Sequence, residues 1–199
     1  MKTRIGENWC QKHLADQQLY PFLEKVDADL AETEHKGGCR YCPGKLHRAS
    51  YKRKPRGVDS WPEEPKRCSF CCDQEGCRRR HTPPSVRFLG RRVYAGLVVV
   101  LVSAMVHGLK PERVGRLRDV LQIDRRTLER WQQWWLVIFV GSSFWKEARA
   151  RFMPRLCQRT LPLSLGLSFG VSERRDRLLE LLKFLAPITT PEAWKELVM

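Results

Sequence analysis

The sequence predicts a mainly α-helical protein with one small β module. Apolar residues recur every three or four positions in most segments, as at Val114, Leu117 and Leu121, which is the period of an amphipathic helix. Two groups of cysteines between residues 39 and 81 instead flank short segments typical of β-strands. The 199 residues are 42% hydrophobic and 30% charged, a balance typical of globular proteins. We expect four parts: an N-terminal helical segment (1–36), a β module (37–87), three helices (88–140) and a C-terminal helical extension (141–199).

The N-terminal segment is predicted to be a helix over residues 11–35, which Pro21 restarts or kinks and Gly37-Gly38 ends. It is the one acidic part of the chain, and we expect it to cover the next domain rather than to form a dimer. The first residues lack the apolar core of a signal peptide, which predicts a cytoplasmic protein.

The β module contains a Cys39-x-x-Cys42 turn followed by Gly44. Such a turn directs two thiolates at one ion, and a second pair of cysteines 30 or so residues later completes a tetrahedral site of four cysteines. In a reducing compartment, clustered cysteines are metal ligands more often than disulfides. We therefore predict a zinc ribbon, with strands over 46–53 and 67–72.

The sequence leaves the second pair of ligands open. Cys68 and Cys71 have the plain ribbon spacing, whereas Cys72 and Cys77 close a longer turn, and His47 or His81 could replace one thiolate. No His-Glu-x-x-His or His-x-Glu pattern occurs, so the zinc is predicted to be structural.

The charge of the chain predicts a polyanionic partner, either nucleic acid or an anionic membrane surface. The net charge is +15, and residues 40–92 hold 15 lysines and arginines against 5 acids. Within the ribbon region, we expect phosphate contacts from Lys52, Arg53, Lys54, Arg56, Arg78, Arg79, Arg80 and Arg87. A solvated basic loop is the alternative.

Residues 93–106 form the most apolar run, which is too short to span a bilayer and is predicted to be a buried helix. A second helix is expected to begin near Pro111 and to end before Ile123, a buried turn residue. Asp124 then caps a third helix with Leu128, Trp131, Trp135 and Ile138 inward and Trp134 off this core stripe. Its outer face carries Arg125, Arg126, Glu129, Arg130 and Gln133. An ordinary helical hairpin with a solvated basic face is the alternative.

After these helices, we expect a short helix that Gly141-Ser142-Ser143 caps and that runs to Phe152, where Pro154 breaks it. A loose stretch over 154–171 and an amphipathic helix capped by Ser172 and stopped at Pro187 then follow. Its leucines are predicted to pack on the preceding helices.

The motif Arg125-Arg-Thr-Leu-x-Arg-Trp131 resembles the helix-turn-helix of bacterial insertion-sequence transposases, resolvases and related regulators. Over residues 36–138, the order of motifs resembles the DNA-binding part of zinc-ribbon transposases and small mobile-element proteins. Cys77-Arg-Arg-Arg-His-Thr-Pro-Pro-Ser resembles the last knuckle of their ribbons, which implies Cys39, Cys42, Cys72 and Cys77 as ligands. The resemblance also implies contacts with double-stranded DNA by Arg125, Arg126, Thr127, Arg130 and Gln133.

Such transposases continue into a nuclease domain with three separated acids, whereas Glu173, Asp176 and Glu180 here lie within two turns of one helix. We therefore expect a non-catalytic, sequence-specific DNA-binding protein of the bacterial nucleoid, acting as a regulator or as an accessory factor in transposition. A second copy, a transposase or a recombinase would be further partners. The alternative is a zinc-ribbon protein associated with RNA or the ribosome.

Overall fold

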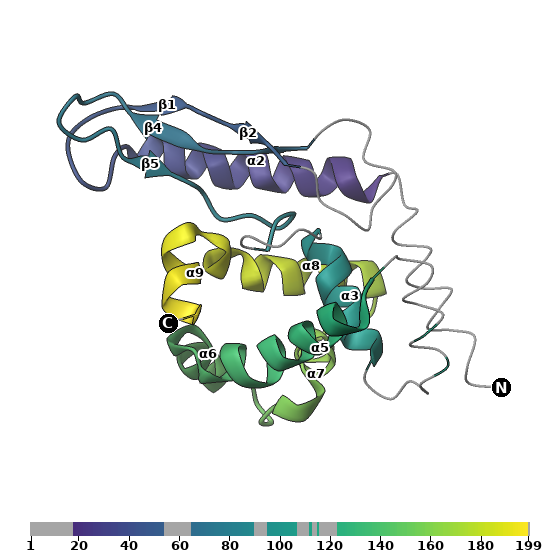
Figure 1. The fold of residues 1–199 in the computed structure, drawn as a ribbon. Coiled ribbons are helices and arrows are strands. Elements are labelled where there is room, and N and C mark those ends of the chain that lie inside the picture. The colour runs from purple at the N-terminus through teal and green to yellow at the C-terminus, as the bar shows by residue number, and fades with distance from the viewer. Residues whose placement is uncertain are drawn as a thin grey trace.

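The computed structural model describes residues 18–53, 65–89, 95–106, 112, 115 and 123–198. As predicted, the described chain is mainly helical with a small antiparallel sheet. Helix α2 (Leu19–Gly37) and the strands form one layer, and the remaining helices form a second body beneath it (Figure 1). We call the strands and cysteine turns of residues 39–81 the ribbon, and the described residues from 95 onward the helical body.

Helix α2 confirms the predicted N-terminal helix where the structure describes it. Pro21 lies in its first turn, where a missing N–H breaks no intrahelical hydrogen bond. Gly38 ends the helix with φ 70°, a conformation that glycine adopts without steric cost, and its N–H donates to the carbonyl of His35. Leu19, Tyr20 and Leu23 are buried against the helical body. Ala31, further along α2, is buried with Leu46 and Phe70 of the ribbon, so the helix packs on the helical body as well as on the next domain that it was expected to cover.

The ribbon is a twisted hairpin with one added strand. Strand β1 (Leu46–Arg48) pairs with β4 (Phe70–Cys72), and β2 (Tyr51–Lys52) pairs with β3 (Lys66–Arg67), so the two predicted strands are each divided in two. Strand β5 (Arg80–His81) pairs with β4 and was not predicted, because Arg80 was interpreted as part of a basic segment leaving the ribbon.

The core of the helical body lies between α3 (Gly96–Val106) and the aromatic residues around α5 (Arg125–Gln133). Val98 to Val102 are all buried, which confirms the predicted apolar helix. A π-helix (Trp134–Phe139) continues α5, and its wider turn brings both Trp134 and Trp135 into the core. The prediction that Trp134 lies off the core was therefore wrong.

For the third predicted helix, the structure confirms the N-terminal cap and the buried residue before it. The carboxylate of Asp124 accepts a hydrogen bond from the N–H of Arg126 at 2.7 Å, and Ile123 is buried before it. The predicted second helix lies outside the described residues except for Glu112 and Gly115, which are helical. The arrangement of all three helices therefore stays a prediction.

The C-terminal region is more helical than predicted. Ser142 caps α6 (Ser143–Ala148) as expected, followed by a 3-10 turn (Arg149–Arg151). The stretch expected to be loose contains a 3-10 turn (Gln158–Thr160) and α7 (Leu163–Leu167). Helix α8 (Arg174–Leu185) begins after Glu173 rather than with a cap from Ser172. A 3-10 turn (Ala186–Thr189) and α9 (Pro191–Val198) then follow.

Within the described part of the chain, none of the helices combines the length and the apolar character needed to cross a membrane.

Candidate metal centre and basic surfaces

Four cysteines meet at the end of the ribbon. The Sγ atoms of Cys39, Cys42, Cys72 and Cys77 all lie within 4.8 Å of one another. The Sγ atoms of Cys39 and Cys77 are 3.8 Å apart, and those of Cys42 and Cys72 are 3.4 Å apart. These separations exceed a disulfide bond, and four thiolates about 2.3 Å from one tetrahedral ion stand about 3.8 Å apart. The predicted set of four is therefore confirmed as a group that fits a metal ion.

The backbone around the cysteines is arranged to stabilise thiolates. The N–H of Gln74 donates to Cys72 Sγ at 3.4 Å, and backbone hydrogen bonds from Tyr41 and Gly44 reach the sulfurs of Cys39 and Cys42. Gly44 is required by close packing, because a Cβ there would lie 2.6 Å from Cys72 Sγ. The backbone amides of each turn thus stabilise the negatively charged thiolates that metal ligation requires.

The thiols differ in acidity. Burial raises the pKa of Cys39, but hydrogen bonds from the Tyr41 backbone and from the side chains of His81 and two neighbouring cysteines bring the pKa down to about 6. Burial raises the pKa of Cys72 to about 12 despite the hydrogen bond from Gln74. Without a cation Cys39 is therefore a ready thiolate, whereas Cys72 must lose its proton when a metal ion binds.

His81 supports the site instead of completing it. Its side chain is buried, with Nε2 3.3 Å from Cys39 Sγ and Nδ1 3.3 Å from a carboxylate oxygen of Glu34. Glu34 also accepts a hydrogen bond from Arg40. A carboxylate that orients a histidine beside a ligand is a common outer shell of metal sites. The sequence indicated His81 only as an alternative ligand, because its contact with Glu34 spans 47 residues.

The remaining candidate ligands lie outside the four-sulfur group. Cys68 is not among the four clustered sulfurs, and burial raises the pKa of its thiol, which disfavours the thiolate that a metal ion would need. The thiol of Cys71 donates to the Arg78 carbonyl at 3.5 Å, and His47 is exposed and lies 3.5 Å from Asp73. The structure thus brings Cys72 and Cys77, the pair that the resemblance implied, beside Cys39 and Cys42.

The ribbon has its own small core beside the cysteines. Leu46 and Phe70 are buried with Ala31 of α2, and the ring of His35 stacks on Phe70 at 5.1 Å between centroids. Because this core is so small, the metal ion is expected to supply much of its stability.

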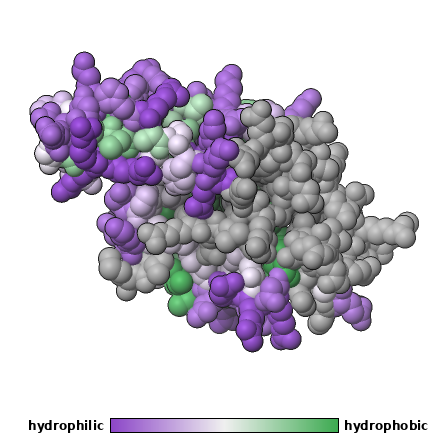
Figure 2. All heavy atoms as spheres, turned by 45° about the horizontal axis from the view of Figure 1, so that its top comes forward, coloured by the Kyte–Doolittle hydropathy of each residue, from purple (hydrophilic) through white to green (hydrophobic). Residues whose placement is uncertain are grey.

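Four of the eight basic residues predicted to contact phosphates are exposed on the ribbon. Lys52, Arg78, Arg79 and Arg80 are exposed, Arg53 is half-buried, and Lys54 and Arg56 lie outside the described residues. Hydrophilic side chains gather over this end of the molecule in Figure 2. The expectation for Arg87 was wrong, because its side chain is buried and paired with Asp27 and Glu24 of α2.

The outer face of α5 is polar and open. Arg125, Arg126, Glu129, Arg130 and Gln133 are exposed, while Leu128 and Trp131 are buried. Arg125 pairs with Glu129 at 2.9 Å, an exposed pair of the kind worth about 0.3–0.5 kcal/mol, so the guanidinium can exchange it for a phosphate at little cost. Thr127 is buried, and its hydroxyl accepts a hydrogen bond from Arg130, so it does not belong to this face.

Comparisons of the chain with protein-family models, curated proteins and solved structures gave no match.

Proposed function

We propose that this protein binds double-stranded DNA through the outer face of α5, on a scaffold stabilised by a structural Zn²⁺ ion, and that it acts as a binding protein rather than as an enzyme. The observation that carries the proposal is the face itself. Three arginines and a glutamine lie exposed on a short helix whose N-terminus is capped by Asp124. The opposite side of this helix, with Leu128 and Trp131, is buried in the core. Arginine and glutamine are the side chains that donate paired hydrogen bonds to guanine and adenine in the major groove.

Zinc is the ion that the donor set favours. Four sulfur ligands in a closed tetrahedral arrangement are typical of structural zinc sites, and each of the four cysteines is accounted for by this site. When bound, the ion would neutralise thiolate charge and hold the two cysteine turns together. Four thiolates around a divalent ion would carry a net charge of about −2, and Arg78, which follows Cys77 in the chain, would help to balance it.

The basic ribbon supplies the electrostatic part of this proposal. A net charge of +15 favours binding to phosphates of any sequence, and α5 would add phosphate contacts from Arg125 and Arg130 together with contacts to base edges. The resemblance of its motifs to the DNA-binding regions of insertion-sequence transposases and small mobile-element proteins supports a role as a regulator or accessory factor in the bacterial cytoplasm.

The proposal is tested by selecting a preferred duplex from a random pool and measuring anisotropy with single variants. Arg126→Ala and Gln133→Ala are expected to weaken the selected duplex by about 5- to 100-fold, since one base contact is worth about 1–3 kcal/mol, and to relax the base preference. Arg155→Ala removes an exposed arginine outside α5 and the ribbon and should leave both unchanged. Loss of binding in the control alone, or none in the α5 variants, would contradict the proposal.

RNA binding through the ribbon is the second candidate, and Tyr41 favours it. Tyr41 is 52% exposed, and the Arg79 guanidinium lies 4.2 Å from its ring centroid. An exposed ring beside arginine suits stacking on an unpaired base. Tyr41→Ala should then weaken single-stranded RNA binding about tenfold, whereas the duplex proposal expects little change.

A further inference from the structure

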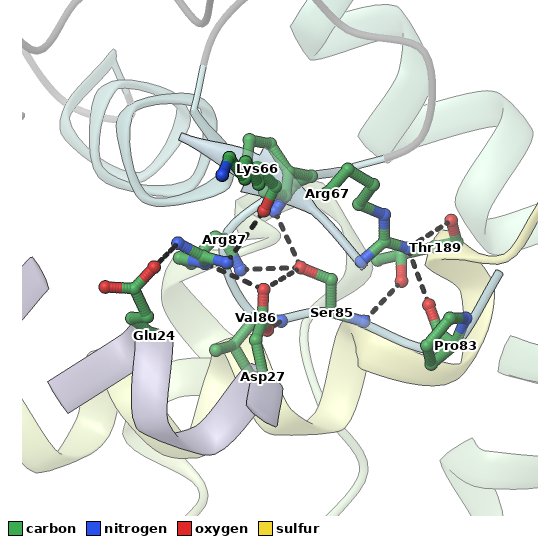
Figure 3. Close-up of polar contacts among 10 residues, drawn as sticks. Glu24, Asp27, Lys66, Arg67, Pro83, Ser85, Val86, Arg87 and Thr189 are labelled. Carbon is green, nitrogen blue, oxygen red and sulfur yellow. Dashed lines mark hydrogen bonds and ion pairs between the residues drawn. The ribbon is translucent and has the colours of Figure 1, made fainter. Parts of the chain in front are cut away.

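A buried polar network joins the ribbon to the helical body (Figure 3). Asp27 of α2 is 3% exposed and accepts hydrogen bonds from Ser85 Oγ at 2.6 Å, from the Val86 N–H at 2.7 Å and from Arg87 Nε at 2.9 Å. Arg87 also donates to Glu24 at 2.9 Å and to the Lys66 carbonyl of β3 at 3.0 Å. Asp27 thus links α2 to the segment that leaves the ribbon, and Arg87 extends the link to β3.

The network continues into the C-terminal part of the helical body. The hydroxyl of Thr189 accepts from the Ser85 N–H at 2.8 Å and donates to the Ala186 carbonyl at 2.6 Å. Arg67, which is buried on β3, donates to the Pro83 carbonyl at 2.7 Å and to the Thr189 carbonyl at 3.5 Å. We call Asp27, Arg67, Ser85, Arg87 and Thr189 the joint.

The joint favours one arrangement of ribbon and body. Buried charges are costly unless every one is paired and hydrogen-bonded, so a rotation of the ribbon that separated Asp27 from Arg87 would leave both charges uncompensated. Such loss costs about 3–5 kcal/mol in proteins. The two parts are therefore held as one rigid unit.

The end of the ribbon carries a second basic surface, away from α5. We call Tyr41, Arg78, Arg79 and Arg80 the ribbon tip. Arg78 has φ 45°, a left-handed conformation that costs a non-glycine residue about 1 kcal/mol or more, so a glycine would be more stable there unless the side chain has a use. Arg79 is held against Tyr41, and all three arginines are exposed.

The ribbon tip and the α5 face are well separated. From Asp27 to its end at Gly37, α2 advances by ten residue steps of 1.5 Å, so the tip stands about 15 Å beyond the joint. Helices α8 and α9 lie between the ribbon layer and α5 in Figure 1. The tip and the α5 face therefore belong to different parts of the molecule.

We infer that the joint holds the ribbon tip and α5 at a fixed separation, so that one molecule contacts double-stranded DNA at two places: α5 in the major groove and the tip on backbone phosphates outside that segment. Asp27 is the positioning residue. This inference rests on the proposed function, and it adds a second contact and a required length of duplex.

The test measures, by anisotropy, the association constants for an 8-base-pair DNA hairpin and a 30-base-pair duplex. Each constant is divided by the number of positions at which the protein can sit on that DNA. The wild type should bind the long duplex more than tenfold more tightly. Arg79→Ala/Arg80→Ala, on the surface, should reduce this ratio to about one, because the loss of affinity for the long duplex exceeds the loss for the hairpin. Asp27→Asn should reduce the ratio at least threefold with the hairpin affinity unchanged, and the exposed neighbour Asp29→Asn should behave as wild type. Thr189→Val removes only a hydroxyl and serves as a milder change of the joint should the Asp27 variant fold poorly.

Three outcomes would overturn the inference. One is a wild-type ratio near one. Another is a ratio that survives Asp27→Asn or Thr189→Val in folded protein. The third is an equal loss on both DNAs in the Arg79/Arg80 variant, which would place the tip and α5 on the same short segment. If binding in any of these cases still depends on Arg126, only the inference of a second contact is refuted and the proposed function is kept. If the protein binds neither DNA, both the inference and the proposed function are refuted.

Discussion

Gly44→Ala is expected to disable the metal centre without touching a ligand. The added Cβ would lie 2.6 Å from Cys72 Sγ, 2.9 Å from Asp73 Oδ1 and 3.0 Å from Gln74 Cβ. Because unstrained contacts of this kind need about 3.5 Å or more, the sulfur must move by about 1 Å, five times the roughly 0.2 Å that metal–ligand distances tolerate. Changes in the outer shell alone cost about 10–100-fold in affinity, so displacing a ligand should cost at least 100-fold, or about 2.7 kcal/mol.

The assay for this prediction is competition for Zn²⁺ with a chromophoric chelator, on wild type, Gly44→Ala and Gly76→Ala. Gly76 lies in the second cysteine turn, but a Cβ there meets nothing within 4 Å, so this variant controls for the glycine substitution itself. Gly76→Ala should match the wild type. The reasoning is refuted if Gly44→Ala holds zinc within threefold of the wild type, because the close approach would then not constrain the site.

Three further predictions follow from the site and the joint. Chelation of the metal should unfold the ribbon at a lower temperature than the helical body, giving two calorimetric transitions in place of one. Zinc binding at pH 7 should release at least two protons, from Cys42 and Cys72, whose thiol pKa values are raised, while Cys39 with a pKa of about 6 is already ionised. Proton competition therefore weakens zinc binding as pH falls, and calorimetry in buffers of different ionisation enthalpy counts the protons. Asp27→Asn should lower the free energy of unfolding by about 3–5 kcal/mol in urea titration, against less than 0.5 kcal/mol for Asp29→Asn.

Features set by neighbouring residues were predictable from the sequence. The four cysteines come together because each pair is carried by a short turn, and a hairpin between the turns is enough to join them. The cap of Asp124 on α5 and the cap of Ser142 on α6 are likewise contacts over two or three residues. Such local chemistry is the same in any fold that contains the segment.

Features set by distant residues were not predictable. Arg87 was expected to be a phosphate ligand because its sequence neighbours are basic, and only the fold reveals Asp27, 60 positions earlier, as its partner. The π-helix after Gln133 changes the phase of the apolar pattern, so the period that correctly placed Trp131 misplaced Trp134. Strand β5 exists because β4 offers it a free edge, which no pattern within Arg78 to Arg80 indicates.

The measurement that tests the central claim most directly is binding of the zinc-loaded protein to random duplex DNA and to single-stranded RNA across a salt series, with Arg125→Ala/Arg130→Ala in parallel. We predict tighter binding to the duplex, and a slope of log affinity against log salt that falls by up to about 1.8 units in the double variant, because each lost phosphate contact removes about 0.9. Equal or tighter binding to RNA, with a slope that the α5 variant leaves unchanged, would contradict the account and assign nucleic-acid binding to the ribbon.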